Sequence, residues 1–526
     1  MTEVLRGPAP LLELNARGVL DAADIHLATR IGQLGQETSP SVLLALALCV
    51  RSVRQGSVAL RLADVPRLVV AEDGEPLVWP SEWEVDVSRS PLLGGPLRVE
   101  HGLLYLDRYW RQEVQVAADL LRRAAVPVLL DRVVLGAALA RIWPGSEPDD
   151  QRTAAATCAL STVSVLAGGP GTGKTTTVSR LLVALREASL QELRIALAAP
   201  TGKASARLQE SVHREDRKAL SQAEHDWLRT LSSSTLHRLL GARRGSAQYW
   251  HHAGNRLPYD VVVVDEASMV SLAMFGRLLE ALRPDTRLIL VGDPDQLASI
   301  EAGAILADLV AEVGGRTASR AVELREVVPG DVAEELVAET PGSHLRDGMR
   351  SLRTVHRFEE NGAIAVLAAA VRAGDGDAAV AAVGDLLREV PEGEAVPDSQ
   401  VKPILLEQLR EVISAARAGD ALDALKALGG HRMLCAHRSG PRGVSWWSEG
   451  FRDGSSRART SFCVVTAGMP VSRCLSERTT TTTACGTVTP VSWSLRVASW
   501  SATSPPVGSR SGCRSVGSAT SSRCTR

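Results

Sequence analysis

Apolar positions along this chain follow two patterns, and the change from one to the other falls near residue 149. Before it, "SVLLALALCVRSVRQGSVAL" (41–60) has the continuous apolar character of a packed helix, and "VQVAADLLRRAAVP" (114–127) has amphipathic spacing. After it, short runs of β-branched residues alternate with helical stretches. The pattern predicts a mostly helical N-terminal segment followed by an α/β region.

Four apolar runs of the second region are typical of strands in a parallel sheet. Continuous β-branched runs suit strands that are buried on both faces. Each run ends in small or acidic residues, and open α/β sheets bind their ligands at the carboxyl ends of strands. The four runs are "TVSVLAG" (162–168), "LRIALAAP" (193–200), "YDVVVVDEA" (259–267) and "TRLILVGD" (286–293).

Two further changes along the chain divide the remainder. A second mixed segment follows residue 343, and it contains the helical stretch "ILLEQLREVISAARAGDALDALKAL". Beyond residue 450 the chain loses lysine and almost all acids, and serine, threonine, arginine, cysteine and tryptophan dominate. Such a segment has little reason to fold, so we expect it to be disordered. The expected domains are residues 1–145, a helical N-terminal domain that scaffolds or docks a partner; 146–343, a motor domain; 344–450, a partial second motor domain; and 451–526, an aberrant tail.

Composition limits the partners and the compartment. The 526 residues carry a formal net charge of −1, so local patches must hold any nucleic acid. No apolar run approaches the roughly 20 residues of a membrane span, and the start lacks a signal-peptide pattern. We therefore expect a cytoplasmic protein without a membrane partner. Five of the eight cysteines lie after residue 460, and the others are isolated, without zinc-ligand spacing.

The stretch "LAGGPGTGKTTTV" (166–178) satisfies G-x-x-x-x-G-K-[ST] between a predicted strand and a predicted helix. Its glycines let backbone N–H groups close around phosphate oxygens, and the helix N-terminus adds a favourable dipole. Lys174 would place its charge on the β- and γ-phosphates of ATP, and the Thr175 hydroxyl would ligate Mg²⁺. The flanking strand and helix disfavour the alternative, a chance glycine-rich turn. The candidate nucleotide-binding residues here are Gly168, Gly169, Pro170, Gly171, Thr172, Gly173, Lys174, Thr175 and Thr176.

Acidic and amide side chains follow the next two strands. In "VVVVDEAS" (261–268), Asp265 would hold Mg²⁺, and Glu266 would orient or deprotonate the attacking water. An acidic pair after a strand is common, but its position downstream of the phosphate loop strengthens the interpretation. In "VGDPDQLASIEAG" (291–303), Gln296 is placed to reach a γ-phosphate, although a loop glutamine is usually only solvated.

Taken in order, the motifs resemble those of the RecD family, the alpha subunits of exodeoxyribonuclease V within helicase superfamily 1. The resemblance covers about residues 10–447, and "LLYLDRYWRQE" and "NARGVLDAADIHLA" resemble the actinobacterial branch. It implies P-loop NTPase motor domains of the RecA-like fold. The motifs that carry it are "LAGGPGTGKTTTV", "APTGKASARL", "TLHRLLG", "VVVDEASMV", "VGDPDQLASIEAGAIL" and "HRFEENGAIAVLAAAVRAGD".

The resemblance also implies an activity and partners. The activity is ATP-driven translocation on single-stranded DNA with 5′→3′ unwinding, in a helicase–nuclease that repairs double-strand breaks by recombination. RecB-like and RecC-like chains would be the partners, and single-stranded and duplex-end DNA the substrates. The polarity comes from the resemblance alone. The nuclease activity belongs to a partner subunit in the family, and this sequence has no nuclease-like carboxylate cluster.

The resemblance assigns roles to six more residues. Gln151 matches the glutamine that reads the adenine edge, with a solvated helix glutamine as the equal alternative. Arg357 matches the arginine that reaches the γ-phosphate from the second motor domain, where it would stabilise transition-state charge. The residues that match motifs touching single-stranded DNA are Thr201, Lys203, Thr235 and His237. Hydroxyls, a lysine and loop N–H groups can grip phosphates without reading bases.

The pattern breaks after "LCAHRSGPRGV". The family continues into a small inserted β-domain and the motifs that complete the second motor domain, and the sequence here departs from them. With GC-rich codons chosen for "ACGTVTPVSWS" (484–494), a neighbouring frame translates as "GLWNGDTGVVV", which resembles the family's "GLYNGDTGVV". We hypothesise a frameshift between about residues 447 and 479, followed by out-of-frame translation. A genuine basic, serine-rich tail is the alternative, and resequencing the gene decides between them.

Two other functions are compatible with the sequence. A truncated, non-unwinding subunit would bind ATP or only dock on partner chains, and the missing motifs favour impaired unwinding. A P-loop kinase or another non-helicase ATPase would leave "TLHRLLG" and "GDPDQL" unexplained.

Overall fold

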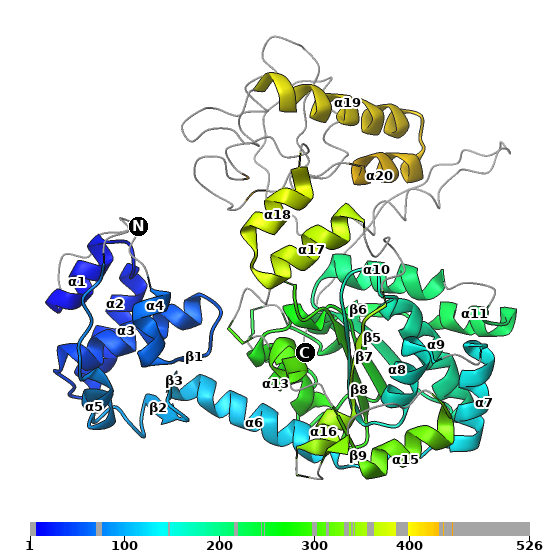
Figure 1. Cartoon of the computed structure of the whole chain (residues 1–526), viewed down its shortest axis with the longest axis horizontal. Coiled ribbons are helices and arrows are strands. Elements are labelled where there is room, and N and C mark those ends of the chain that lie inside the picture. The colour runs from blue at the N-terminus through cyan, green and yellow to red at the C-terminus, as the bar shows by residue number, and fades with distance from the viewer. Residues whose placement is uncertain are drawn as a thin grey trace, which may run out of the picture. The chain divides into compact units, whose positions relative to one another are not determined.

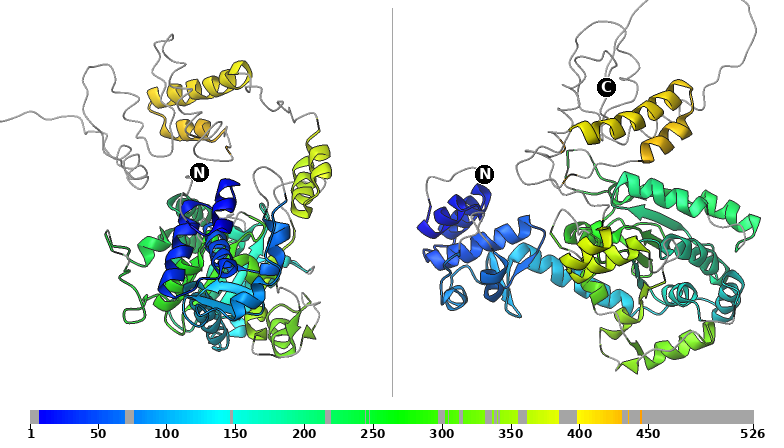
Figure 2. Two further views of the ribbon diagram at one scale, coloured as in Figure 1. Left: turned by 90° about the vertical axis from the view of Figure 1, so that its left-hand side faces the viewer. Right: turned by 45° about the horizontal axis from the view of Figure 1, so that its top comes forward.

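The structure, a computed structural model, describes residues 7–69, 76–145, 148–214, 219–243, 245–246, 248–296, 302–303, 305–311, 315–330, 336–337, 340, 342–354, 362–384, 398–430, 435 and 444. The chain divides into two compact units, Met1–Leu387 and Arg388–Arg526. Figures 1 and 2 draw the elements of each unit. Arg357 and the expected tail, residues 451–526, lie outside the described residues.

The N-terminal part of the first unit is mostly helical, as the apolar spacing predicts. Its central helix, α3 (Pro40–Arg54), buries every residue from Val42 to Cys49, because neighbouring elements cover it on several sides. The other elements are α1 (Ala9–Ala16), α2 (Ala22–Leu34), β1 (Ala59–Leu60), η1 (Leu62–Asp64), α4 (Val65–Leu68), α5 (Trp83–Ser88), β2 (Leu97–Glu100), β3 (Leu103–Leu106), α6 (Asp107–Ala124) and α7 (Arg132–Ile142).

A small antiparallel sheet interrupts these helices, and the sequence interpretation missed it. Its strand order is β1-β3-β2, and β2 and β3 form a hairpin. The two turn residues, His101 and Gly102, have φ of 51° and 75°, which is typical of two-residue hairpin loops. The His-Gly pair was therefore the local signal for this hairpin.

A six-stranded sheet forms the core of the α/β region. Its strand order is β11-β4-β8-β7-β5-β6, and every neighbouring pair is parallel. The four predicted strands are confirmed, and two others, β6 and β11, were missed. The strands are β4 (Val163–Gly168), β5 (Ile195–Ala199), β6 (Ser233–Thr235), β7 (Val261–Val264), β8 (Arg287–Gly292) and β11 (Met349–Leu352).

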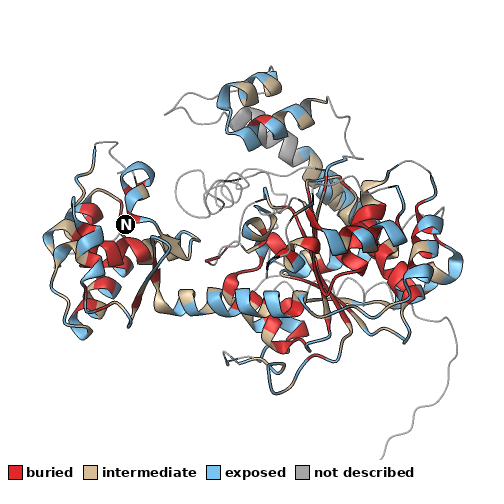
Figure 3. Ribbon diagram, turned by 60° about the horizontal axis from the view of Figure 1, so that its bottom comes forward, coloured by how far each residue is buried: buried red, intermediate tan, exposed pale blue. Residues whose placement is uncertain are grey.

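Alternate side chains of the central strands enter two different hydrophobic clusters. On β7, Val261 and Val263 pack into one cluster, and Val262 and Val264 pack into the other. Both faces of the sheet are therefore covered, and β4 and β7 are buried at every residue (Figure 3). The covering helices include α8 (Asp150–Ala159), α9 (Lys174–Ala188), α10 (Gly202–His213), α11 (Gln222–Thr230), α12 (Leu236–Leu239), η2 (Ala267–Met269), α13 (Leu272–Ala281) and α14 (Ile305–Ala311).

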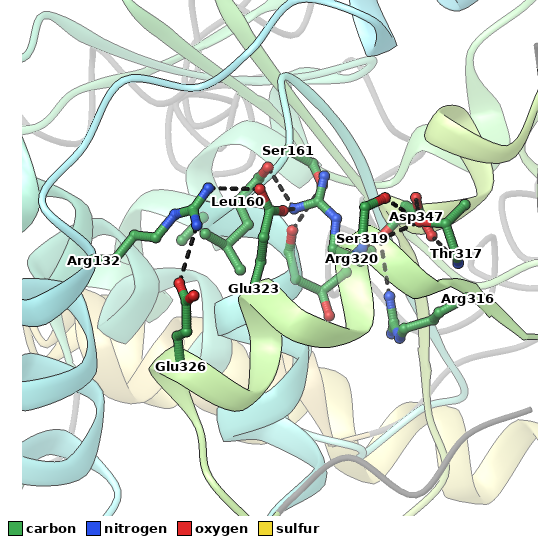
Figure 4. Close-up of polar contacts among 12 residues, drawn as sticks. Arg132, Leu160, Ser161, Arg316, Thr317, Ser319, Arg320, Glu323, Glu326 and Asp347 are labelled. Atoms are coloured by element: carbon green, nitrogen blue, oxygen red, sulfur yellow. Dashed lines mark hydrogen bonds and ion pairs between the residues drawn. The ribbon is translucent and has the colours of Figure 1, made fainter. Parts of the chain in front are cut away.

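A network of buried polar groups holds the segment that leads into β11 (Figure 4). Asp347, which is 1% exposed, accepts hydrogen bonds from the Thr317 backbone N–H at 3.0 Å and from the Thr317 hydroxyl at 2.6 Å. Arg320 Nη1 donates to Leu160 O at 2.6 Å, which ties this segment to the end of α8. The elements involved are β9 (Arg316–Thr317), α15 (Ala318–Val327), β10 (Leu336–Val337) and α16 (Ser343–Asp347). The six-stranded sheet thus continues past residue 343, the boundary that the sequence suggested.

Helices α17 (Ala363–Ala373) and α18 (Gly376–Val383) follow in the first unit. The second unit contains α19 (Asp398–Arg417) and α20 (Ala421–Gly429), in the stretch that the sequence predicts as helical. Gln408 Nε2 donates to Ala427 O at 2.7 Å and joins these two helices. Within the part of the chain that the structure describes, none of the helices combines the length and apolar character needed to cross a bilayer.

Candidate nucleotide-binding site

Five strands of the parallel sheet deliver the predicted motif residues to one edge. Because all six strands run in the same direction, the residues that follow each of them leave from the carboxyl edge. The glycine-rich loop follows β4, Gln296 lies beyond β8, and Asp265 and Glu266 follow β7 directly. Thr201 and Lys203 follow β5, and Thr235 ends β6 with His237 just beyond it. The sheet therefore orders the candidate nucleotide residues and the candidate DNA residues along one edge.

The glycine-rich loop turns sharply between β4 and α9. Gly171 and Gly173 both have φ of 82°, in the left-handed region where a side chain would be strained. A Cβ on Gly168 would lie 2.7 Å from the Thr172 hydroxyl, so only glycine fits this close approach. The first intrahelical bond of α9 runs from Thr177 N–H to Gly173 O at 2.9 Å. The start of α9 thus lies at the end of the loop, and a helix N-terminus is a favourable place for an anion.

Lys174 lies inside this loop. Its Nζ donates to Gly168 O at 2.5 Å and to Gly169 O at 2.9 Å. The ammonium group is thus held beside the N-terminus of α9, where a phosphate would meet both the charge and the helix dipole. This arrangement fits the predicted role of Lys174.

Asp265 and Glu266 form the acidic pair at the end of β7. Burial and the neighbouring Glu266 charge raise the pKa of Asp265 to about 6, against the opposing charges of Lys174 and Arg207. Glu266 has φ 52° and ψ 42°, a left-handed conformation that is uncommon for a residue with a side chain. Its N–H donates to Asp265 Oδ1 at 2.9 Å. Such backbone strain is concentrated at functional sites.

Gln296 and Asp293 occupy the end of β8. Asp293 is 2% exposed and accepts hydrogen bonds from the Asp295 N–H at 3.1 Å and from Gln296 Nε2 at 3.4 Å. Asp293 thus holds the exposed Gln296 side chain near the strand end. The sequence interpretation did not single out Asp293, although it lies in the same "GDPDQ" motif.

Gln151 lies beside the glycine-rich loop. Its Nε2 donates to Thr172 O at 3.3 Å, and its Oε1 accepts from Trp143 Nε1 at 3.4 Å. A cavity of about 170 Å³ opens here. Its lining residues are Pro148, Asp149, Asp150, Gln151, Thr172, Leu352 and Thr354. The structure therefore brings Gln151 into contact with the glycine-rich loop.

The four candidate DNA residues lie at the ends of β5 and β6, and two of them have a structural role as well. The hydroxyls of Thr201 and Thr235 cap α10 and α12, accepting from Ala204 N–H and Arg238 N–H, each at 3.2 Å. Lys203 and His237 are exposed, and the His237 ring lies 6.2 Å from the ring of Tyr249. Capping fixes both helix starts, which sets where the exposed pair points.

The donor set at the edge suits ATP with a divalent cation. The loop supplies a lysine and a helix N-terminus for phosphate oxygens. Thr175 and Asp265 supply the oxygen ligands that Mg²⁺ prefers. A cation beside the largely buried Asp265 would offset the burial that raises the pKa of its carboxyl group.

Known proteins match both regions of the chain. Residues 16–105 match the family described as RecBCD enzyme subunit RecD, N-terminal domain, and residues 151–302 match the AAA domain family. The RecBCD enzyme subunit RecD of Mycolicibacterium smegmatis is 45% identical over 452 residues, which cover 83% of this chain and 73% of that protein. The ATP-dependent RecD2 DNA helicase of Deinococcus radiodurans is 40% identical over 139 residues, 26% of this chain and 16% of that protein.

Among solved structures, the Pif1 helicase from Candida albicans is similar at 17% identity, covering 51% of this chain and 55% of that chain. The TM-score of this match is 0.29.

Proposed function

The chain belongs to the RecD family of RecBCD enzyme subunits, and from that premise we propose that it is an ATP-dependent DNA helicase subunit. It hydrolyses ATP at the carboxyl edge of the six-stranded sheet and moves along single-stranded DNA in the 5′→3′ direction. Its work is the repair of double-strand breaks by homologous recombination.

One observation carries this proposal: a single sheet edge holds a phosphate-binding loop and, on neighbouring strands, groups suited to DNA phosphates. The loop follows β4 and the acidic pair follows β7, with β8 between them. Next to β7 come β5 and β6, whose ends carry Lys203 and His237. A change at the nucleotide is thus transmitted through adjacent strand ends to the DNA contacts.

The residues that follow β4, β7 and β8 have separate roles in ATP hydrolysis. Lys174 and the N–H groups at the start of α9 bind and orient the β- and γ-phosphates. Glu266 orients the attacking water and accepts its proton, and Gln296 detects the γ-phosphate. Thr175 and Asp265 would hold Mg²⁺, which would supply positive charge to offset the charge on the phosphate oxygens. Arg357 supplies a further positive charge from the segment after β11.

At the DNA end, Thr201, Lys203, Thr235 and His237 contact the backbone of a single strand. Such contacts are independent of base sequence, which suits a protein that must move along any DNA. Because the whole chain has a net charge of only −1, this binding depends on local groups and weakens with salt.

The remaining assignments concern partners and domains. Residues 1–145 form a helical domain that docks onto partner chains, 146–343 contain the ATP-binding motor, and 344–450 belong to a partial second motor. The partners are RecB-like and RecC-like subunits, the substrate is a duplex end with its single strands, and the compartment is the cytoplasm.

The test is strand separation by the chain assembled with its RecB-like and RecC-like partners. We expect ATP-dependent unwinding of a duplex with a 5′ single-stranded tail, and loss of this activity in an assembly that carries Lys174→Ala. Equal unwinding of the 5′-tailed duplex by both assemblies would show that this subunit does not drive it.

A further inference from the structure

Trp143 ends α7 beside the nucleotide side of the sheet, and its surroundings fix its position. The residue is 4% exposed, and its backbone N–H donates to Leu139 O at 2.9 Å. Its carbonyl accepts from Arg152 Nη1 at 3.3 Å, and the Arg180 guanidinium lies 5.6 Å from the centre of its ring. The indole is therefore a fixed group against which a neighbouring side chain can be oriented.

The buried indole N–H of Trp143 needs an acceptor, and Gln151 provides one. Trp143 Nε1 donates to Gln151 Oε1 at 3.4 Å, while Gln151 Nε2 donates to Thr172 O at 3.3 Å. A glutamine amide has two acceptor lone pairs on its oxygen and two N–H donors. Among the described residues, one of each is used by these contacts, so one acceptor site and one donor site remain on the side chain that lines the cavity.

These two contacts also oppose rotation of the Gln151 amide by half a turn. After such a rotation, the amide N–H groups would face the indole N–H of Trp143, and the amide oxygen would face the carbonyl oxygen of Thr172. Two donors and two acceptors would then lose these hydrogen bonds, and the buried indole N–H of Trp143 would be left without its acceptor, which is costly. Trp143 and Thr172 thus select one orientation of the amide.

The remaining acceptor and donor match one purine edge and not the other. Adenine presents an N6 amino donor beside the N7 acceptor, whereas guanine presents two acceptors, O6 and N7. Gln151 Oε1 can accept from the adenine amino group while Nε2 donates to N7. With guanine, Oε1 would face O6, and a site built for a hydrogen-bond donor rejects a ligand that lacks it.

We propose that Trp143 is a positioning residue for nucleotide selection: its indole N–H locks the Gln151 amide in the orientation that favours ATP over GTP. Trp143 acts through Gln151 and need not touch the nucleotide. This inference rests on the proposed ATP-binding function of the site.

The test measures the dissociation constants of the full-length chain for ATP and for GTP, by displacement of a fluorescent ATP analogue. Binding alone is measured, so the result does not depend on hydrolysis or unwinding. Trp143→Phe keeps an aromatic ring but removes the N–H. We expect it to reduce the preference for ATP over GTP on the order of five-fold, the value of one net hydrogen bond.

Trp227→Phe is the matched control. Trp227 also lies beneath an arginine of α9, Arg186, whose guanidinium is 4.7 Å from the ring centre, and it does not line the cavity. This control should keep the wild-type preference for ATP over GTP. It therefore distinguishes the loss of any indole beside an α9 arginine from the loss of the hydrogen bond between Trp143 and Gln151.

A second variant tests whether Trp143 acts through Gln151. Gln151→Glu removes the N–H donor that would bond to adenine N7. The double variant with Trp143→Phe should lose no further preference for ATP, because Trp143 then has no amide to orient. The inference would be overturned if the two substitutions reduced the preference for ATP additively, or if Trp143→Phe left the ratio of the ATP and GTP dissociation constants unchanged. Either result would leave the proposed ATP-binding function standing. If the wild-type chain bound neither nucleotide, the proposed function itself would fail and the inference with it.

Discussion

The carboxylate of Asp150 accepts a hydrogen bond from the backbone N–H of Arg353 at 2.9 Å, although the two residues lie about 200 positions apart in the chain. The same carboxylate pairs with the Arg350 guanidinium at 3.2 Å. Asp150 starts α8, the helix that carries Gln151, and Arg353 directly follows β11. One side chain therefore joins the helix beside the cavity to the residue that follows β11.

This junction predicts an effect of Asp150→Ala on nucleotide affinity. Leu352 and Thr354, which flank Arg353, line the cavity together with Gln151, so loosening the strand exit opens its wall. We expect the dissociation constant for ATP to rise on the order of ten-fold, as for the loss of hydrogen bonds to a charged group. Asp226→Ala is the control, because that carboxylate is 60% exposed on α11; an unchanged affinity in Asp150→Ala would refute the coupling.

Substitution of Glu266 should separate binding from chemistry. Glu266→Gln retains the size of the side chain but not its basicity, so the attacking water loses its proton acceptor. We expect kcat for ATP hydrolysis to fall at least about 100-fold with little change in ATP affinity. Steady-state hydrolysis beside equilibrium nucleotide binding checks this, and a fall in affinity with unchanged kcat would assign Glu266 to binding instead.

Two residues that follow β5 are expected to act differently: Lys203 in DNA binding and Thr201 in capping α10. Measurements of DNA binding and of stability distinguish these two effects. Lys203→Ala should weaken the binding of single-stranded DNA without changing the melting temperature. The slope of log K for DNA binding against log salt concentration should become smaller by about 0.7, the value for one phosphate contact on a single strand. Thr201→Ala should lower the stability by about 1 kcal/mol, because the start of α10 loses its capping hydroxyl. Thr201→Ser keeps the cap and serves as the control. A Lys203→Ala chain that binds DNA with wild-type affinity and salt dependence would remove Lys203 from the interface.

Acid stability should depend on Asp260. Hydrogen bonds from the Arg194 side chain, and then from the Arg194 backbone N–H and Arg283, hold the pKa of the Asp260 carboxyl well below its usual range. Because the pKa is lowered in the folded state, the stabilisation is fully present above the unfolded value of about 3.9 and is lost as the pH falls below it.

Asp260→Asn should therefore lower the melting temperature by about 2 °C at pH 7. The difference from wild type should shrink as the pH is lowered from 5 toward 3. Thermal unfolding across this range is the measurement, with Asp285→Asn, a carboxylate that is 70% exposed, as the control. A difference that stays constant with pH would mean that the charge of Asp260 is not responsible.

The geometry of the glycine-rich loop could be predicted from sequence because its requirements are local. Two left-handed glycines, a lysine and a helix start lie within a few residues, so spacing alone identifies them. The four predicted strands were equally visible, since each lies in a continuous apolar run. In contrast, β11 has the sequence MRSL, which is not an apolar run, and its identity as a strand depends on parallel pairing with β4, more than 180 residues earlier. Local pattern carries no information about such a partner.

The same limit applies to the side chains around Gln151. The contacts with Trp143 and Thr172 bring together the end of α7, the start of α8 and the glycine-rich loop. Nothing in the spacing of a Trp-Pro-Gly segment predicts which amide its indole will reach. The capping roles of Thr201 and Thr235 were missed for a different reason. Threonine before a helix is a known capping signal, but the DNA motif offered a competing interpretation of the same hydroxyls.

The most direct measurement is the rate of ATP hydrolysis by the full-length chain, with and without single-stranded DNA, for wild type and Lys174→Ala. Lys426→Ala, which removes an exposed lysine of α20, is the control. If ATP cleavage at the glycine-rich loop is coupled to DNA at the neighbouring strand ends, DNA will accelerate the wild-type and control rates. Lys174→Ala will then be slower by at least about 100-fold. A wild-type rate that is the same with and without DNA, or a Lys174→Ala rate equal to it, would contradict the coupling.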